Sequence, residues 1–178
     1  IGASQVAANT QFKEMGLFDF SPSASTHNPL ISNNMMGSDA GGLIAEDASM
    51  FGIGTDPATT LDVSALGQRN AIAVYWYITE DITIDVIRYL INSDGTSDLS
   101  LHLMSYTLDI GSNFGDLAAG TLNAHVHSVE ATVNTIKTGT LTKDAADIDS
   151  GKIVIGFVEN ESGASDVSVA LTIQYHIR

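Results

Sequence analysis

The feature that most constrains the fold is the C-terminal run of residues 166–178. Its odd-numbered positions from 167 to 177 are all apolar, whereas its even-numbered positions from 168 to 176 are small or polar. This alternation is typical of a β-strand that buries one face, because successive side chains point to opposite sides. At about 3.3 Å per residue the run is roughly twice as long as a usual strand. We therefore expect a sheet that is organised around this strand.

Further strand patterns follow one another from residue 70 onward, separated by turn residues. They cover residues 71–78, 82–91, 99–108, 121–129, 131–141 and 152–159. The run 152–159 is almost continuously apolar, which predicts a strand buried on both faces. In 82–91 the apolar parity changes between Val86 and Ile87, which predicts a β-bulge. No segment has a sustained helical period. The pattern predicts an all-β fold, a jelly-roll-like antiparallel sandwich of about seven or eight strands.

The chain divides into three parts by composition. Residues 1–50 are rich in Ser, Asn, Ala, Gly and Met, which predicts an extended N-terminal arm. Residues 51–69 are predicted to form a glycine-rich joint with a short strand. Residues 70–178 are predicted to form the β-sandwich domain. The arm contains an apolar cluster that would be a liability if exposed. Its members are Phe12, Met15, Leu17, Phe18 and Phe20. They would dock either on their own domain or on a neighbouring subunit.

Charge and composition exclude several classes of partner. The 178 residues include 21 acidic and 7 basic side chains, with a formal net charge of −14. Such a surface repels phosphate backbones and anionic lipids, so we expect no nucleic-acid or membrane partner. No run of about 18 apolar residues is present, which predicts no membrane-spanning helix. Cysteine is absent, which removes disulfides and thiolate chemistry.

Two patterns could bind metal ions. His125 and His127 are two residues apart on one expected strand face, so both could ligate zinc or iron, with His102, His176 or Glu130 as a further ligand. The spacing does not bring these residues together, and surface histidines are the alternative. Clustered oxygens at Asp94 and Asp98, and at Asp144, Asp147 and Asp149, could bind calcium, although such runs usually form solvated turns. We expect no resident cofactor.

No catalytic constellation is visible. The chain has no Gly-x-Ser-x-Gly elbow, no P-loop and no dinucleotide fingerprint, so we predict that it is not an enzyme. Trp76 lies between Tyr75 and Tyr77, so one face of this strand would enter the core. The other face could stack on a carbohydrate or contact a subunit.

Three segments carry a resemblance to a known class of protein. They are Gly52-Ile-Gly-Thr-Asp-Pro57 with Leu61-Asp-Val63, Asp81-Ile-Thr-Ile-Asp-Val-Ile87 and the closing Ile173-Gln-Tyr-His-Ile177. Together they resemble virion structural proteins of tailed, marine-type bacteriophages. The resemblance implies a homotrimeric sandwich that decorates the capsid or forms part of a tail fibre. Its partners would then be sister subunits and the major capsid protein, and its location the extracellular virus particle.

Three non-enzymatic functions follow as hypotheses. The first is a capsid decoration or cement subunit that binds the shell through the arm, with Phe12, Leu17, Phe18, Phe20 and Trp76 as contact residues. The second is a tail-fibre or receptor-binding module that contacts a host-surface glycan, with calcium in its acidic loops. The third is a secreted filament or surface-layer subunit whose arm adds a strand to a neighbour.

Overall fold

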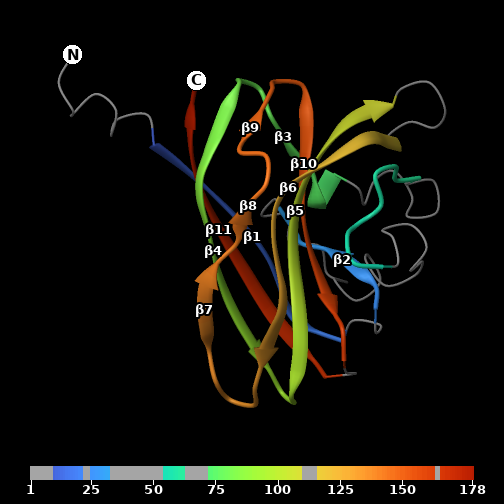
Figure 1. The fold of residues 1–178 in the computed structure, drawn as a ribbon, viewed down its shortest axis with the longest axis vertical. Coiled ribbons are helices and arrows are strands. Elements are labelled where there is room, and N and C mark those ends of the chain that lie inside the picture. Colours follow the sequence, from blue (N-terminus) through green and yellow to red (C-terminus); the bar gives the residue numbers. More distant parts are fainter. Residues whose placement is uncertain (1–9, 22–24, 33–53, 63–71, 110–115, 163–164) are drawn as a thin grey trace.

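The computed structural model describes residues 10–21, 25–32, 54–62, 72–109, 116–162 and 165–178. Within these ranges the chain forms antiparallel strands in two sheets, with one short helical turn at residues 72–74. No helix in the described part of the chain is long and apolar enough to cross a membrane. The two curled sheets pack against each other (Figure 1). The predicted all-β, jelly-roll-like sandwich is therefore confirmed.

The first sheet is organised around the C-terminal strand, as the alternation predicted. Its spatial order is β1 (Thr10–Phe20), β11 (Val167–Ile177), β4 (Ile82–Ser93) and β7 (Lys137–Thr140), and β9 (Asp147–Ile148) also pairs with β4. Val167, Val169, Leu171 and Ile173 of β11 are buried. The side chains between them face outward and are half-buried. The period of two thus correctly identified the strand and, from Val167 to Ile173, its inner face; beyond the register shift at Gln174/Tyr175, Ile177 is 42% exposed.

The second sheet contains the strands that position the candidate site. Its order is β2 (His27–Pro29), β10 (Lys152–Asn160), β5 (Ser97–Asp109), β6 (Asp116–Ala131) and β8 (Thr142–Lys143), and β3 (Trp76–Tyr77) also pairs with β10. The described residues thus contain eleven strands, more than the expected seven or eight. Four strands are additional: β1, which lies in the predicted arm, and β2, β8 and β9, which have two or three residues each. Strands of two or three residues are too short for their periodicity to be visible in the sequence.

Two apolar cores explain why the second sheet is so strongly buried. The larger core fills the space between the sheets and includes Leu101, Val158 and Leu171. A smaller core lies on the opposite face of β5 and β10, where Leu61 and Val74 cover Tyr106 and Phe157. The prediction that the run 152–159 is buried on both faces is therefore confirmed. Residues 54–62 and 72–75 cover the outer face of β5 and β10, which the strand patterns alone did not predict.

A β-bulge changes the inward face of β4, as the parity change predicted. Ile84 pairs with Tyr175, whereas Val86 pairs with the preceding residue Gln174, so Asp85 is the extra residue. Ile84 and Ile87 are fully buried and Val86 is only half-buried. The bulge thus lies slightly earlier than the predicted position between Val86 and Ile87.

Part of the predicted arm is an integral strand of the domain. Residues 10–20 form β1, which pairs along most of β11, and residues 27–29 form β2. Met15, Leu17 and Phe20 of β1 are buried in the main core. The pairing register shifts between Leu17 and Phe20. Residues 1–9, 22–24 and 33–50 of the predicted arm lie outside the described residues, as does most of the predicted joint.

Candidate functional site

The register of the second sheet gathers four histidines on its outer face. His125 and His127 are two residues apart on β6 and therefore share a face. His102 on β5 is the cross-strand partner of His125. His27 on β2 is the partner of Glu159 on β10. These side chains lie on the side away from the inter-sheet core, so strand pairing brings together residues from three separate parts of the chain.

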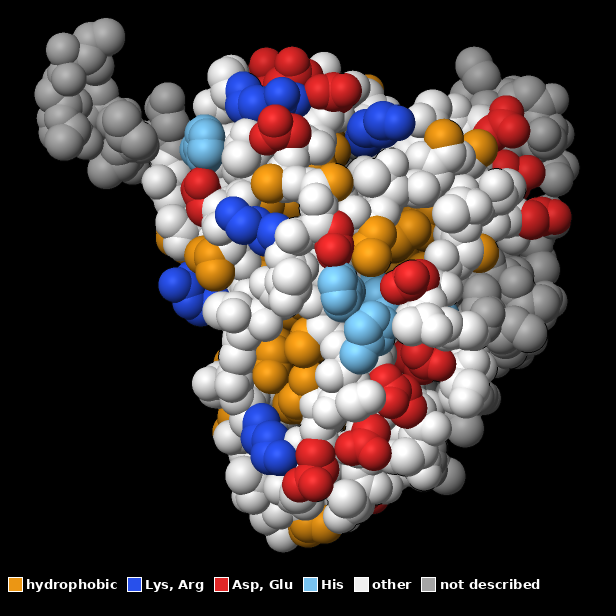
Figure 2. All heavy atoms as spheres, viewed as in Figure 1, with side chains coloured by type: hydrophobic (Ala, Val, Ile, Leu, Met, Phe, Trp, Pro, Cys, Tyr) orange, Lys and Arg blue, Asp and Glu red, His pale blue; other side chains and the backbone are white. Residues whose placement is uncertain are grey.

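The four imidazole rings form a continuous cluster. The ring centroids of His27 and His102 are 5.0 Å apart, those of His102 and His127 are 5.0 Å apart, and those of His125 and His127 are 4.9 Å apart. Figure 2 shows histidine side chains gathered in the middle of one face, with acidic side chains beside them. The cluster therefore combines nitrogen ligands with a negatively charged surrounding surface.

His102 is the buried centre of this cluster. Its side chain is fully buried, and neither ring nitrogen makes a hydrogen bond of good geometry to a described residue. Asp56, in the covering segment, places its Oδ1 3.3 Å from Nε2. Burial, reinforced by the neighbouring histidines, lowers the pKa of His102 to about 3, against a weak opposing effect of the Thr55 backbone. The ring is therefore uncharged at neutral pH and keeps a lone pair on one nitrogen.

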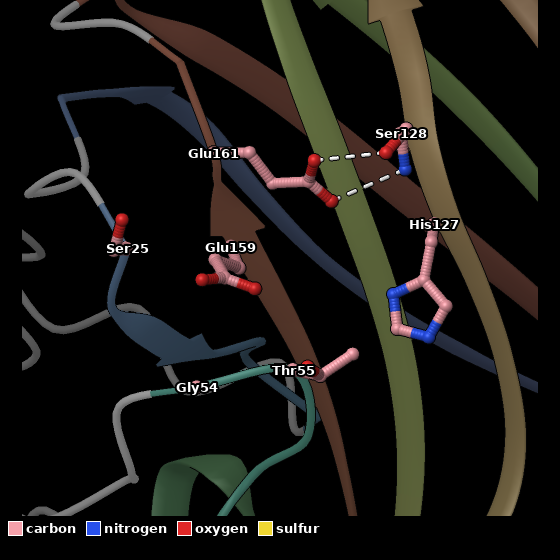
Figure 3. A pocket seen from close by; sticks show the side chains of 7 residues that line it. All are labelled: Ser25, Gly54, Thr55, His127, Ser128, Glu159 and Glu161. Carbon is pink, nitrogen blue, oxygen red and sulfur yellow. Dashed lines mark hydrogen bonds between the residues drawn. The ribbon is translucent and has the colours of Figure 1, made fainter.

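His127 is oriented by a chain of hydrogen bonds. Its Nδ1 lies 3.1 Å from Ser100 Oγ. The Ser100 hydroxyl donates its proton to Glu161, so it accepts the proton on His127 Nδ1. Glu161 also accepts hydrogen bonds of 3.2 Å and 2.9 Å from the backbone N–H and the hydroxyl of Ser128 (Figure 3). This arrangement leaves the lone pair of His127 on Nε2, the nitrogen without the proton.

His125 has a similar acidic partner. Its Nδ1 lies 2.6 Å from Asp144 Oδ2, and both side chains are partly accessible to solvent. A carboxylate on one imidazole nitrogen fixes the orientation of the ring. Asp144 therefore orients the ring of His125, whereas Ser100 orients the ring of His127.

Glu159 adds a buried carboxyl group to the site. Its Oε2 lies 3.4 Å from His27 Nε2. Burial, followed by the negative charges of Glu161 and Asp56, raises the pKa of Glu159 to about 7. The carboxyl group therefore gains a proton close to neutral pH, two to three pH units above an ordinary glutamate.

A pocket opens beside the cluster and connects it to solvent. It has a volume of about 390 Å³. Figure 3 shows its lining side chains, which come from β6, the end of β10 and the segments around residues 25 and 54–55. They are Ser25, Gly54, Thr55, His127, Ser128, Glu159 and Glu161. Carboxylates and imidazoles around an open pocket are suited to binding a cation.

Three residues are close enough to hold a metal ion together. One ligand atom from each of Asp56, His102 and His127 lies within 4.8 Å of the other two. Of the further ligands that the sequence suggested, the structure thus places His102 beside His127. His176 lies on β11 in the other sheet, 2.9 Å from Asp85. Sequence reasoning missed Asp56, because it is far from His102 and His127 in the chain and only the Asp-Pro turn marks it.

Two further residues that the sequence suggested as metal ligands serve other contacts. Glu130 lies 3.4 Å from Lys137 Nζ. Asp94 Oδ1 accepts a 2.9 Å hydrogen bond from the backbone N–H of Asp166.

The other acidic residues proposed to bind calcium make contacts within the protein. The backbone N–H of Asp98 donates a 2.9 Å hydrogen bond to Ser162 Oγ. Arg178 lies 3.6 Å from Asp147 and 2.7 Å from Asp149. Within the described residues, Asp94 and Asp98 are not part of a three-ligand group. Calcium binding at these loops stays a prediction.

The predicted contact residues fall into two sets. Leu17 and Phe20 are buried in the core of their own chain, because they are on the inner face of β1. Phe12 and Phe18 are 63% and 76% exposed. Trp76 is half-buried and packs on Tyr175, with ring centroids 5.1 Å apart. Of the predicted set, Phe12 and Phe18 are thus the side chains that are open to a partner.

Comparison with known proteins gives little information. No protein-family model matches the chain, and no curated protein matches it. One similar solved chain comes from the "Structure of deformed wing virus carrying the GFP gene", with 5% sequence identity and a TM-score of 0.33. The alignment covers 100% of this chain but only 48% of the viral chain. A TM-score of this size establishes neither a shared fold nor a shared function.

Proposed function

We propose that the protein is a non-enzymatic structural subunit of a virion that binds its neighbours through β1. The observation that carries this proposal is the exposure of Phe12 and Phe18 on an edge strand whose other face buries Met15 and Leu17 in the core. Large apolar side chains that remain exposed on a well-packed sheet are typical of a protein-binding surface. Their position on β1 means that the contact surface is held rigidly by the sandwich.

The exposed apolar surface continues from β1 onto the neighbouring strands. Gly16 pairs with Ala170, which in turn pairs with Leu90 on β4. All three face outward, and Leu90 is 49% exposed. The Phe18 ring reaches within 3.8 Å of the position that a side chain on Gly16 would occupy. We name this surface, formed by Phe12, Phe18, Ala170 and Leu90, the β1 face.

The β1 face fits a cementing function. Burial of apolar area there would contribute about 25 cal/mol per Å², repeated over many symmetric copies. The net charge of −14 favours shell or sister subunits over packaged nucleic acid as partners. We propose capsid decoration, as a homotrimer on the major capsid protein, ahead of a place in a tail fibre.

A second candidate function is a filament or surface-layer subunit. It is favoured by the edge position of β1, which has β11 on one side and no other named strand on its opposite side among the described residues. The isolated bridge from Gly16 to Ile31 occupies only one point of this edge. An open edge can accept a strand from a neighbouring chain. Filaments of the purified protein in electron micrographs would favour this function, whereas discrete trimers would favour decoration.

The double variant Phe12→Ser, Phe18→Ser tests the β1 face. Both side chains are exposed, so we expect an unchanged melting temperature. Binding to particles stripped of the native protein should weaken by at least about tenfold, because central aromatic residues dominate interface energies. Co-sedimentation with the particles measures this binding, and light scattering reports the state of the free protein.

Ile136→Ser provides the matched control. Ile136 is 68% exposed and directly precedes β7, at the opposite edge of the same sheet from β1. This variant should bind particles like the unmodified protein. If the double phenylalanine variant co-sediments as well as Ile136→Ser, the β1 face is not the attachment surface.

A further inference from the structure

We propose that His102, His127 and Asp56 bind a divalent transition-metal ion, and that Zn²⁺ matches the site best. In a tetrahedral zinc site, bonds of about 2.0–2.2 Å place neighbouring ligand atoms roughly 3.3–3.5 Å apart. The 3.3 Å distance between His102 Nε2 and Asp56 Oδ1 already has this value. All three ligand atoms lie within 4.8 Å of one another. A small movement of the accessible His127 would bring its ring nitrogen to the distance that Zn²⁺ requires.

The buried ring of His102 is the independent observation that points to a ligand. It is fully buried at the centre of the cluster, and neither nitrogen makes a hydrogen bond of good geometry to a described residue. Buried polar atoms in folded proteins almost always have a partner. A metal ion bound between His102 Nε2 and Asp56 would supply this partner, because the ion accepts the lone pair of the nitrogen.

The surrounding residues already orient the ligands. Ser100 donates its hydroxyl proton to Glu161 and accepts the proton on His127 Nδ1, which leaves Nε2 free to coordinate. Metal-bound histidines typically have such a partner on their second nitrogen. His125, held by Asp144, lies next to His127 and can supply the fourth ligand in place of water.

The ligand types select the class of ion. Two imidazoles and one carboxylate suit Zn²⁺ and related transition metals, whereas Ca²⁺ and Mg²⁺ prefer sites made of oxygen atoms alone. The carboxylate of Glu161 lines the open pocket and would attract a cation into it.

The position of the site gives the ion a structural role. Asp56 belongs to the segment that covers the second core, where Ala58 accepts a 2.9 Å hydrogen bond from the Tyr106 hydroxyl. Leu61 exchanges two backbone hydrogen bonds with Leu117. A metal ion would fasten this cover to β5 and β6 near Asp56. This inference goes beyond the proposed attachment function, because the site is on the other sheet from the β1 face.

Zinc titration of the full-length protein tests the site. After treatment with EDTA and removal of the chelator, isothermal titration calorimetry should show one Zn²⁺ per chain, and zinc should raise the melting temperature. His127→Gln and Asp56→Asn should each weaken zinc binding by at least about tenfold. Both side chains are accessible, and the melting temperature of each variant in EDTA should match that of the unmodified protein.

His176→Gln is the matched control, because His176 also has an acidic partner but lies on the other sheet. It should bind zinc like the unmodified protein. Absence of stoichiometric zinc binding by the unmodified protein would overturn the proposal. Unchanged affinity in both ligand variants, or an equal loss in His176→Gln, would overturn it as well. None of these results depends on whether the β1 face binds particles.

Discussion

Replacement of Leu171 by aspartate should prevent the protein from folding. Leu171 is fully buried between the two sheets, and its side chain lies close to Gly156 of β10. A carboxylate at this position would lose its hydration without gaining a partner, at a cost of more than about 4 kcal/mol. This cost is a large part of the 5–15 kcal/mol by which domains are usually stable. Urea denaturation followed by circular dichroism should show no cooperative transition.

Thr172→Asp is the control for this variant. Thr172 is the next residue on β11, faces outward and pairs with Arg88 of β4. Its replacement should change the free energy of unfolding by less than about 1 kcal/mol. A Leu171→Asp protein that is soluble and unfolds as cooperatively as Thr172→Asp would contradict the inward assignment of Leu171.

Removal of residues 1–20 should also abolish the fold. It deletes β1, exposes the edge of β11 and takes Met15, Leu17 and Phe20 out of the main core. Truncation of one such side chain costs about 2–5 kcal/mol, so the loss of three exceeds the usual stability of a domain. We expect an insoluble product or a chain without a cooperative thermal transition.

Two point variants separate packing from other effects of this deletion. Leu17→Ala should lower the free energy of unfolding by about 2–5 kcal/mol. Phe18→Ala, at the exposed neighbouring position, should change it by no more than about 0.5 kcal/mol. If the truncated protein unfolds cooperatively at the temperature of the full chain, β1 is instead a detachable arm.

The strongest sequence patterns predicted the structure because their periods are local. Val167, Val169 and Leu171 alternate without interruption, and β11 follows them. The continuous apolar run 152–159 likewise identified the doubly buried strand β10. In β1 the alternation of Met15 and Leu17 breaks before Phe20. Asp19 there adopts a positive φ of 52°, where the register shifts. This irregularity made a strand resemble part of an extended arm.

The candidate metal site could be predicted only in part. The spacing of His125 and His127 is a local signal, and it correctly placed both on one face. His102 joins them through the antiparallel register of β5 and β6, and the sequence does not specify this register. Asp56 joins through a covering segment whose position depends on the second core. Contacts of this kind arise from tertiary packing, so no short motif contains them.

Electron cryo-microscopy of particles from the native source, with and without this protein, tests the proposed structural function most directly. The proposed function predicts density for the sandwich at regular positions on the particle, with Phe12 and Phe18 facing a neighbouring subunit. Particles that lack this density while the protein remains a free monomer in light scattering would contradict it.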